Sequence, residues 1–198
     1  MYTMELIILL IFSYLAGSVN FSILLFKLLG KEDPRTSFSG NAGVTNVYRQ
    51  AGMVWAAVVL LLDVGRAAAI ALFAEHFLTP GQVPWPGLSL VIGNRFPCFH
   101  RFKGGKGVAA YLGFSLPITP LGAALSALAW VAIYLLKRTP FIASFAMIFV
   151  LGLGIIAGCS YKPAAIVGTI LTVLFIIYGH NKNITEFIRK IPRSNSNA

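Results

Sequence analysis

A glycine- and lysine-rich segment is the part of the sequence that most clearly predicts chemistry. It covers residues 102–110 and reads Phe-Lys-Gly-Gly-Lys-Gly-Val-Ala-Ala. A glycine turn that opens a helix presents unpaired backbone N–H groups and the positive end of the helix dipole to an anion. Lys106 adds a full charge. We interpret the segment as a phosphate-binding loop that includes Gly104 and Gly105; the alternative is a connector whose lysines only mark membrane topology.

This segment differs from the triphosphate-binding loop of nucleotide hydrolases. The glycine that begins such a loop would have to stand at position 100, which is His100. The Ser or Thr that binds the metal in those loops is replaced by Gly107. The sequence therefore disfavours nucleotide triphosphate chemistry.

A second polar segment, residues 33–49, is longer than a connection between two helices needs to be. It is rich in glycine, amide and hydroxyl side chains, and long ordered loops often carry binding groups. An ordinary connecting turn is the alternative interpretation. Its candidate binding residues are Ser39, Asn41, Gly43, Thr45, Asn46 and Arg49.

Two further places carry candidate polar groups. His180 and Asn183 are spaced i, i+3, so they share a helix face if the preceding helix continues. His180 could orient or deprotonate a hydroxyl group, or donate to a phosphate; a satisfied polar residue at a helix end is the alternative. Ser144 lies inside an apolar run, where a serine usually bonds its own backbone.

Other features predict structure rather than catalysis. Asp63 and Arg66 are spaced i, i+3 inside an apolar run, and we expect them to pair, because unpaired charges in a membrane are costly. Gly154 and Gly158 form a helix-packing motif. Neither aspartate of the chain follows a His by five residues, so the His-x-x-x-x-Asp acyltransferase motif is absent. The sequence has no Cys/His cluster, and Cys98 and Cys159 should lie near opposite membrane faces, which disfavours both a metal site and a disulfide.

The composition places these groups in a membrane protein. Of the 198 residues, 57% are hydrophobic and 11% are charged, whereas a soluble domain has roughly 25% charged residues. Seven apolar runs can be drawn, of which the fourth is too short to cross a bilayer of about 30 Å without tilting or re-entering. The runs cover residues 4–29, 53–78, 88–102, 107–116, 121–136, 141–157 and 164–178.

The basic residues predict the orientation of the bundle. Most of the 16 Lys and Arg residues flank the first, third and fifth loops or follow the last apolar run, and the intervening loops hold only Lys162. Under the positive-inside rule this predicts an N-terminus outside, a C-terminus in the cytoplasm and an odd number of spans. We therefore predict an all-α integral membrane protein with seven transmembrane helices and cytoplasmic active-site loops. Residues 1–193 form one domain, and residues 194–198 a disordered tail.

Together the polar segments resemble the bacterial acyl-phosphate:glycerol-3-phosphate acyltransferases, the PlsY family. The resemblance covers nearly the whole chain in three blocks. The blocks are Gly17-Ser18 with Asp33-x-Arg35, Ser39-Gly40-Asn41, Gly43 and Thr45-Asn46; Phe96-Pro97, Phe99 and Phe102-Lys103-Gly104-Gly105-Lys106-Gly107-Val108-Ala109; and His180-x-x-Asn183-Ile184.

The resemblance implies transfer of a fatty acyl group from acyl-phosphate to the 1-hydroxyl of glycerol 3-phosphate, giving lysophosphatidic acid for phospholipid biosynthesis. It also implies a multi-pass bacterial inner-membrane protein in contact with lipid, with no metal or coenzyme; we expect a monomer that binds no nucleic acid. By motif position, Ser39, Arg49, Lys106, Ser144, His180 and Asn183 match residues that hold glycerol 3-phosphate. Gly43, Thr45, Gly104 and Gly105 match the residues around the donor phosphate.

The chain departs from the family pattern at four positions. Asn94 stands where a His is usual, Phe38 where a Gly precedes Ser-Gly-Asn, Phe141 where a Ser is expected, and Arg66 in place of a Lys. These departures leave open a paralogue that acylates another polyol phosphate. A second alternative is a non-enzymatic transporter of organic anions, because the broken fourth span and the charged loops could also line a pathway.

Overall fold

Helices form most of the backbone between residues 2 and 190, the part of the chain that the computed structural model describes. No strand occurs among these residues, so the predicted all-α class is confirmed. The predicted tail lies outside the described residues. The α-helices are α1 Tyr2–Ser18, α2 Phe21–Leu28, α3 Val44–Ala51, α4 Met53–Phe77, α5 Pro84–Arg95, α6 Val108–Ile118, α7 Pro120–Lys137, α8 Pro140–Gly158, α9 Pro163–Tyr178 and α10 Asn181–Lys190; two short 3-10 helices are η1 Pro34–Thr36 and η2 Cys98–His100.

The long helices have the apolar exterior of a membrane bundle. Large side chains such as Ile8, Leu61, Leu128 and Phe149 are exposed, whereas water-soluble helices turn most such residues inward. Within residues 2–190, four helical stretches are long and apolar enough to cross a bilayer, or five if α9 and α10 are taken as one bent span. Helices α5 and α6 have 12 and 11 residues, which is short for a core of about 30 Å. The number of spans and their orientation thus remain predictions.

The first predicted run is broken into α1 and α2 at Val19–Asn20. The Asn20 side chain begins α2 by accepting a hydrogen bond from the Ile23 N–H at 3.1 Å. Arg66 of α4 donates to the carbonyl of Val19, which has no partner within α1, and pairs with Asp63 at 2.8 Å. The predicted pairing within α4 is confirmed, and the same arginine also satisfies the break in the neighbouring span.

Two glycines allow the backbones of α1 and α5 to touch. A Cβ atom on Gly17 would lie 2.1 Å from the Leu90 carbonyl oxygen, and one on Gly93 would lie 2.2 Å from that of Tyr14. Small residues permit such close helix packing in membranes. The contact fixes where the C-terminal end of α5 stands, and the glycine-lysine segment leaves from that end. The predicted packing role of Gly154 and Gly158 is similar, because both face the α6–α7 turn at Ile118 and Thr119.

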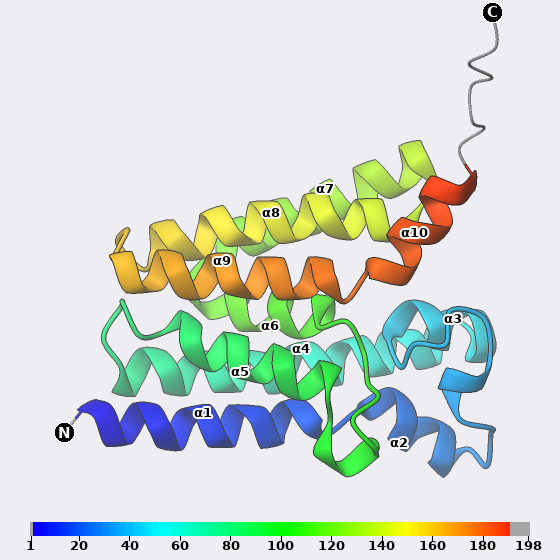
Figure 1. The fold of residues 1–198 in the computed structure, drawn as a ribbon, viewed down its shortest axis with the longest axis horizontal. Coiled ribbons are helices and arrows are strands. Elements are labelled where there is room, and N and C mark those ends of the chain that lie inside the picture. Colours follow the sequence, from blue (N-terminus) through cyan, green and yellow to red (C-terminus); the bar gives the residue numbers. More distant parts are fainter. Residues whose placement is uncertain (1, 191–198) are drawn as a thin grey trace, which may run out of the picture.

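The polar segments collect at one end of the bundle. Figure 1 shows α2, α3 and α10 at the end away from the N-terminus, with the connection between α5 and α6 beside α2. Some boundaries differ from the predicted ones. The third run ends at Arg95 rather than at residue 102 because Pro97 lacks the N–H that a continuing helix needs. Helix α3 lies inside a segment predicted to be a loop, and α10 is a separate helix bent 50° from α9.

Candidate active site

A cavity of about 450 Å³ lies among α3, α4, α6, α7, α8 and the α9–α10 turn. It brings together residues that are up to 144 positions apart in the sequence, from Ser39 to Asn183. Most of its polar lining comes from the connections and helix ends, which we call the polar side. Its apolar lining comes mainly from within helices, and we call this part, which includes Leu60, Leu112, Trp130 and Met147, the apolar side. Of the predicted site residues, Gly104 alone is absent from the lining; those present are Ser39, Asn41, Gly43, Thr45, Asn46, Arg49, Gly105, Lys106, Ser144, His180 and Asn183.

The glycine-lysine segment reaches the cavity differently from the way we predicted. The N–H groups of Gly104 and Gly105 donate to the carbonyls of Arg95 and Asn94, at 3.1 and 2.9 Å, so they are not free to bind an anion. A Cβ atom on Gly104 would lie 2.1 Å from the Asn94 carbonyl oxygen. These two glycines therefore serve close packing against the end of α5.

The free N–H groups belong to the next residues along the chain. Gly107 takes the left-handed conformation, with φ 84°, at the N-cap of α6, a conformation that glycine adopts without steric cost. The first turn, Val108–Ala110, has no intrahelical acceptors for its N–H groups. All four residues line the cavity, so the positive end of the α6 dipole faces it.

The start of α3 provides a second set of N–H groups. Gly43 is the N-cap, and Val44 and Thr45 begin the helix beside the cavity. Asn46 stabilises the preceding loop, because its amide donates to the carbonyls of Pro34 at 2.6 Å and Ser37 at 3.2 Å. This contact supports a positioning role for Asn46. Two helix N-termini, from segments more than 60 residues apart, thus face one cavity.

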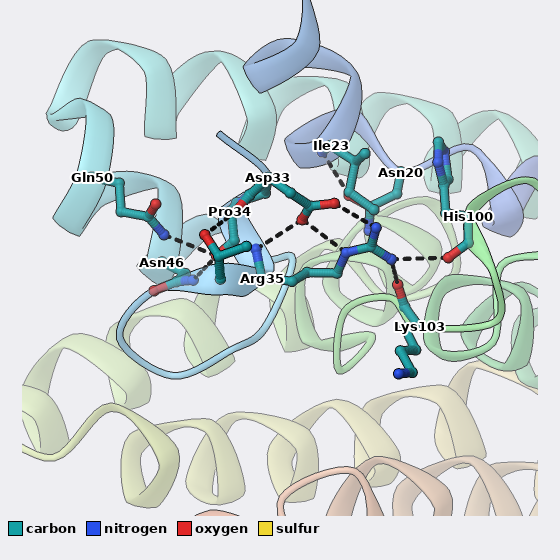
Figure 2. Close-up of polar contacts among 10 residues, drawn as sticks. Asn20, Ile23, Asp33, Pro34, Arg35, Asn46, Gln50, His100 and Lys103 are labelled. Atoms are coloured by element: carbon teal, nitrogen blue, oxygen red, sulfur yellow. Dashed lines mark hydrogen bonds and ion pairs between the residues drawn. The ribbon is translucent and has the colours of Figure 1, made fainter. Parts of the chain in front are cut away.

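Arg35 clamps the two polar segments together (Figure 2). Its guanidinium forms two bonds to the Asp33 carboxylate, at 2.5 and 2.8 Å. Its remaining nitrogen donates to the carbonyls of His100 at 2.9 Å and Lys103 at 2.6 Å. The paired guanidinium lowers the pKa of Asp33 below its ordinary value, chiefly by side-chain hydrogen bonding. Sequence reasoning noted the Asp33-x-Arg35 pattern but did not predict this clamp, because the acceptors are backbone carbonyls from a distant segment.

Lys106 and Asn183 meet across the polar side of the cavity, where the Lys106 ammonium donates to the Asn183 side-chain oxygen. Burial lowers the pKa of Lys106 to about 8, and the nearby positive charges of Arg95 and Arg49 act in the same direction, against Glu186. An ammonium that is partly desolvated beside other cations favours binding of a multiply charged anion.

His180 is buried and neutral. Burial lowers its pKa to about 4, and Lys106 and Arg95 add to that effect. Its Nδ1 atom lies 3.0 Å from the carbonyl oxygen of Ile176. A carbonyl only accepts, so Nδ1 carries the proton, and Nε2 of the neutral ring keeps a lone pair. The arrangement allows His180 to accept a proton from a hydroxyl group in the cavity.

Ser144 has the backbone contact predicted for a serine inside a helix. Its hydroxyl donates to the Pro140 carbonyl at 3.0 Å and accepts from the Trp130 indole at 3.4 Å. Sequence reasoning missed Trp130, which lines the cavity, and it noted Asn94 only as a departure from the family pattern, although Asn94 lines the cavity too. Ser39, Thr45 and Arg49 are exposed and lie on the part of the lining nearest solvent. Cys98 and Cys159 are both free, as predicted.

The apolar helices and the cavity beneath two helix N-termini are those of a membrane protein with an anion-binding site. The family model described as glycerol-3-phosphate acyltransferase matches residues 7–190. Glycerol-3-phosphate acyltransferases from Pseudomonas fluorescens and Methylobacillus flagellatus are 39% and 35% identical to the chain; the alignments cover 90% and 89% of this chain and 94% and 90% of theirs.

Solved structures agree with the sequence comparison. The crystal structure of PlsY, an integral membrane glycerol 3-phosphate acyltransferase, in its glycerol 3-phosphate form superposes with a TM-score of 0.85 at 35% identity, covering 93% of this chain and 92% of that one. Its lysophosphatidic acid form gives a TM-score of 0.83 at 34% identity with the same coverage. The chain belongs to the glycerol-3-phosphate acyltransferase family and is an integral membrane acyltransferase.

Proposed function

We propose that the cavity transfers a fatty acyl group from acyl-phosphate to the 1-hydroxyl of glycerol 3-phosphate, giving lysophosphatidic acid and inorganic phosphate. The convergence of two helix N-termini and Lys106 on one cavity carries the proposal, because this is the arrangement that two phosphate groups require. A relative of similar fold has been crystallised in forms with glycerol 3-phosphate and with lysophosphatidic acid.

The two phosphates occupy different parts of the polar side. Lys106, Arg49 and Ser39 hold the glycerol 3-phosphate group, assisted by Asn183 and Ser144. The donor phosphate lies against the N–H groups at the start of α3 and α6, with Asn41, Gly43, Thr45 and the closely packed Gly105 around it. The two helix dipoles and the cations offset the repulsion between the two anions.

The apolar side of the cavity takes the first part of the acyl chain. Leu60, Leu112, Val131 and Met147 line it, and the bundle around it has an apolar exterior. An acyl chain of ordinary length therefore extends from the cavity between helices toward lipid. This placement keeps the reactive carbonyl at the boundary between the polar and apolar parts.

The reaction needs alignment and charge stabilisation more than a covalent nucleophile. The oxygen of the 1-hydroxyl attacks the carbonyl carbon while its proton passes to Nε2 of neutral His180. The bond between the carbonyl carbon and the phosphate oxygen then breaks, and phosphate leaves with the electron pair. N–H groups directed at the developing oxyanion stabilise the transition state, and the cavity holds both reactants in place.

The setting of this reaction follows from the charge pattern. The Lys- and Arg-rich connections lie at the end of the bundle with the cavity, so this end faces the cytoplasm of a bacterial inner membrane, with the N-terminus outside. Seven membrane-inserted helices satisfy this orientation if α5 and α6 are short segments covered by their neighbours. We expect a monomer that acts without a metal or coenzyme.

The direct test is an assay of the purified protein in lipid nanodiscs with acyl-phosphate and glycerol 3-phosphate. We expect lysophosphatidic acid and phosphate in equal amounts, and no product when acyl-CoA or acyl carrier protein replaces the donor. Other polyol phosphates as acceptors test the departures at Phe38, Asn94 and Phe141. A folded protein that makes no product from the two named substrates, or that prefers another donor or acceptor, contradicts the proposal.

A further inference from the structure

A row of three phenylalanine rings connects α8 with the helix that carries Asn183. Phe145 meets the His180 imidazole edge-on, with ring centroids 5.3 Å apart and planes at 73°. Phe141, one turn earlier on α8, lies 5.7 Å from Phe145 and 5.6 Å from Phe187 of α10. The row therefore contacts the α9–α10 segment on both sides of Asn183.

The α9–α10 bend needs such support because the helical hydrogen-bond pattern changes there. Gly179 and His180 form the turn, and α10 leaves α9 at 50° (Figure 1). The His180 N–H bonds to the Ile177 carbonyl at 2.9 Å, which is a tighter turn than an α-helix has. Local backbone bonds alone thus leave the direction of α10 weakly determined.

Phe187 has a direct geometric link to the site. It follows Asn183 by four residues on α10, so both side chains lie on the same face of the helix. Holding Phe187 against Phe141 turns Asn183 toward the cavity, where its oxygen accepts the bond from Lys106. Phe145 simultaneously fixes the plane of the His180 ring, whose other side is held by the Ile176 carbonyl.

We propose that Phe141, Phe145 and Phe187 are positioning residues for acyl transfer, which fix the α9–α10 bend so that His180 and Asn183 face the substrates. The proposal rests on the function proposed above and assigns to Phe141, where the family pattern has a serine, a structural role in this chain. Phe145 contacts His180 directly, whereas Phe141, which also lines the cavity, and Phe187 contact the other rings, so the row acts through His180 and Asn183.

The rings also keep water from the His180 imidazole. The pKa of His180 therefore reports on this contact, whereas a general loss of packing elsewhere would leave that pKa unchanged. Lys106 from the segment before α6 and Arg95 from the end of α5 are the charged groups near His180, and both lower its pKa, while the Ile176 carbonyl of α9 raises it. Glu186 of α10 acts on Lys106. Opening the row to water raises the pKa of His180 from about 4 toward its ordinary value. Because the neutral ring accepts the proton, activity at pH 6 should then fall more than activity at pH 8.

The kinetic test compares Phe145→Ala with Phe149→Ala, which removes the same ring from an exposed position on the same helix. We expect Phe145→Ala to lower kcat roughly 10- to 100-fold, with KM for both substrates nearly unchanged. Phe145→Tyr keeps the ring and should recover most of kcat, and Phe149→Ala should resemble the wild type. Equal losses in Phe145→Ala and Phe149→Ala, or no loss in Phe145→Ala, overturn the proposal.

The spectroscopic test requires no turnover. The chain has three histidines, so the ¹³C spectrum of histidine-labelled protein is simple, and His180→Gln assigns the resonance. We expect the pKa of His180 to rise in Phe145→Ala and to stay low in Phe149→Ala; an unchanged pKa in Phe145→Ala contradicts the role of the ring. If the wild type makes no lysophosphatidic acid, the proposed function fails, but this titration still tests the contact itself.

Discussion

The cavity has two walls that are held in different ways. The loop wall, residues 33–49 and 94–107, is held by directional hydrogen bonds: Arg35 bonds two backbone carbonyls and Asp33, and Asn46 bonds two more carbonyls. The helix wall, formed by the start of α8 and the α9–α10 turn, is held mainly by the edges of aromatic rings. Lys106 and Asn183 join the two walls.

This difference matches what each wall must do. Backbone N–H groups bind a phosphate group well only if they are already in place, so the loop wall needs contacts with fixed directions. The helix wall instead carries His180 and Asn183, and the packing of aromatic ring edges holds these two residues in place. The comparison predicts that changes in the loop wall impair anion binding, whereas changes in the helix wall impair the chemical step.

The largest effect is expected at the residue that joins the walls. Lys106→Ala removes the half-buried cation, and we expect a loss of kcat/KM of roughly 10²- to 10³-fold. Lys103→Ala removes an exposed charge three residues away and should have little effect. Steady-state assays in nanodiscs measure both. If the two variants lose activity equally, the joining role of Lys106 is wrong.

The pH dependence of the same residue sharpens this test. The pKa of Lys106 is about 8, and the charged form binds phosphate, so kcat/KM should fall as the pH rises through about 8. Arginine stays charged beyond pH 12. In Lys106→Arg the fall in kcat/KM should therefore shift to higher pH, even if the maximum value of kcat/KM is lower. If kcat/KM of Lys106→Arg still falls near pH 8, the fall is caused by the titration of another group.

A packing change beneath the loop wall should rank next. Gly93→Ala places a methyl group 2.2 Å from the Tyr14 carbonyl oxygen, and such overpacking costs about 1–3 kcal/mol. Gly65→Ala meets nothing within 4 Å and serves as the matched control. The midpoint of thermal unfolding, followed by labelling of the buried thiol of Cys159, should fall only in Gly93→Ala. Unchanged stability there would mean that α1 and α5 can separate without cost.

Release of the clamp should have a moderate effect on binding. Arg35→Ala leaves the carbonyls of His100 and Lys103 without this donor, so the two segments of the loop wall can separate. We expect KM for the phosphorylated substrates to rise roughly tenfold, because misplacement by about 1 Å can cost up to about 100-fold, with a smaller change in kcat. Lys31→Ala, which removes an exposed charge from the same connection, controls for net charge. A fall in kcat alone would contradict the division of labour between the walls.

The sequence predicted what depends on local pattern. The long apolar helices α4, α7, α8 and α9 begin and end within a few residues of the predicted runs, because hydrophobic length is a local property. The motif residues were predicted to share one site, and ten of them besides Lys106 line one cavity. Helix α3 was missed because it has only eight residues, too few for a clear apolar run.

The contacts that depend on tertiary structure could not be predicted. Nothing in the Gly104-Gly105 dipeptide says that its N–H groups bond to the end of α5, because the acceptors are carbonyls that every residue has. The distant partners of Arg35 are also backbone carbonyls, so the sequence does not identify them. The aromatic row was unpredictable for another reason, since phenylalanines at helical spacing in an apolar run usually face lipid or core.

The smallest expected effect concerns a departure from the family pattern in the loop wall. Phe38 is exposed and has φ 54°, the left-handed conformation that costs a residue with a Cβ atom about 1–2 kcal/mol. The backbone thus already has the shape that the usual glycine would give it. Phe38→Gly should raise the free energy of unfolding by up to about 1 kcal/mol, and it should leave kcat and KM unchanged.

Phe38→Ala distinguishes the effect of backbone strain from the effect of the ring, because alanine removes the ring but keeps the Cβ atom. If strain is the cause, Phe38→Gly stabilises the protein and Phe38→Ala does not; thiol-labelling midpoints resolve the two. If both variants lose activity instead, the exposed ring itself takes part in binding. The loop wall would then include Phe38 as well as the part that Arg35 and Asn46 stabilise. The departure at Phe38 would then be a functional change, whereas the expected result makes it a tolerated substitution on an unchanged loop.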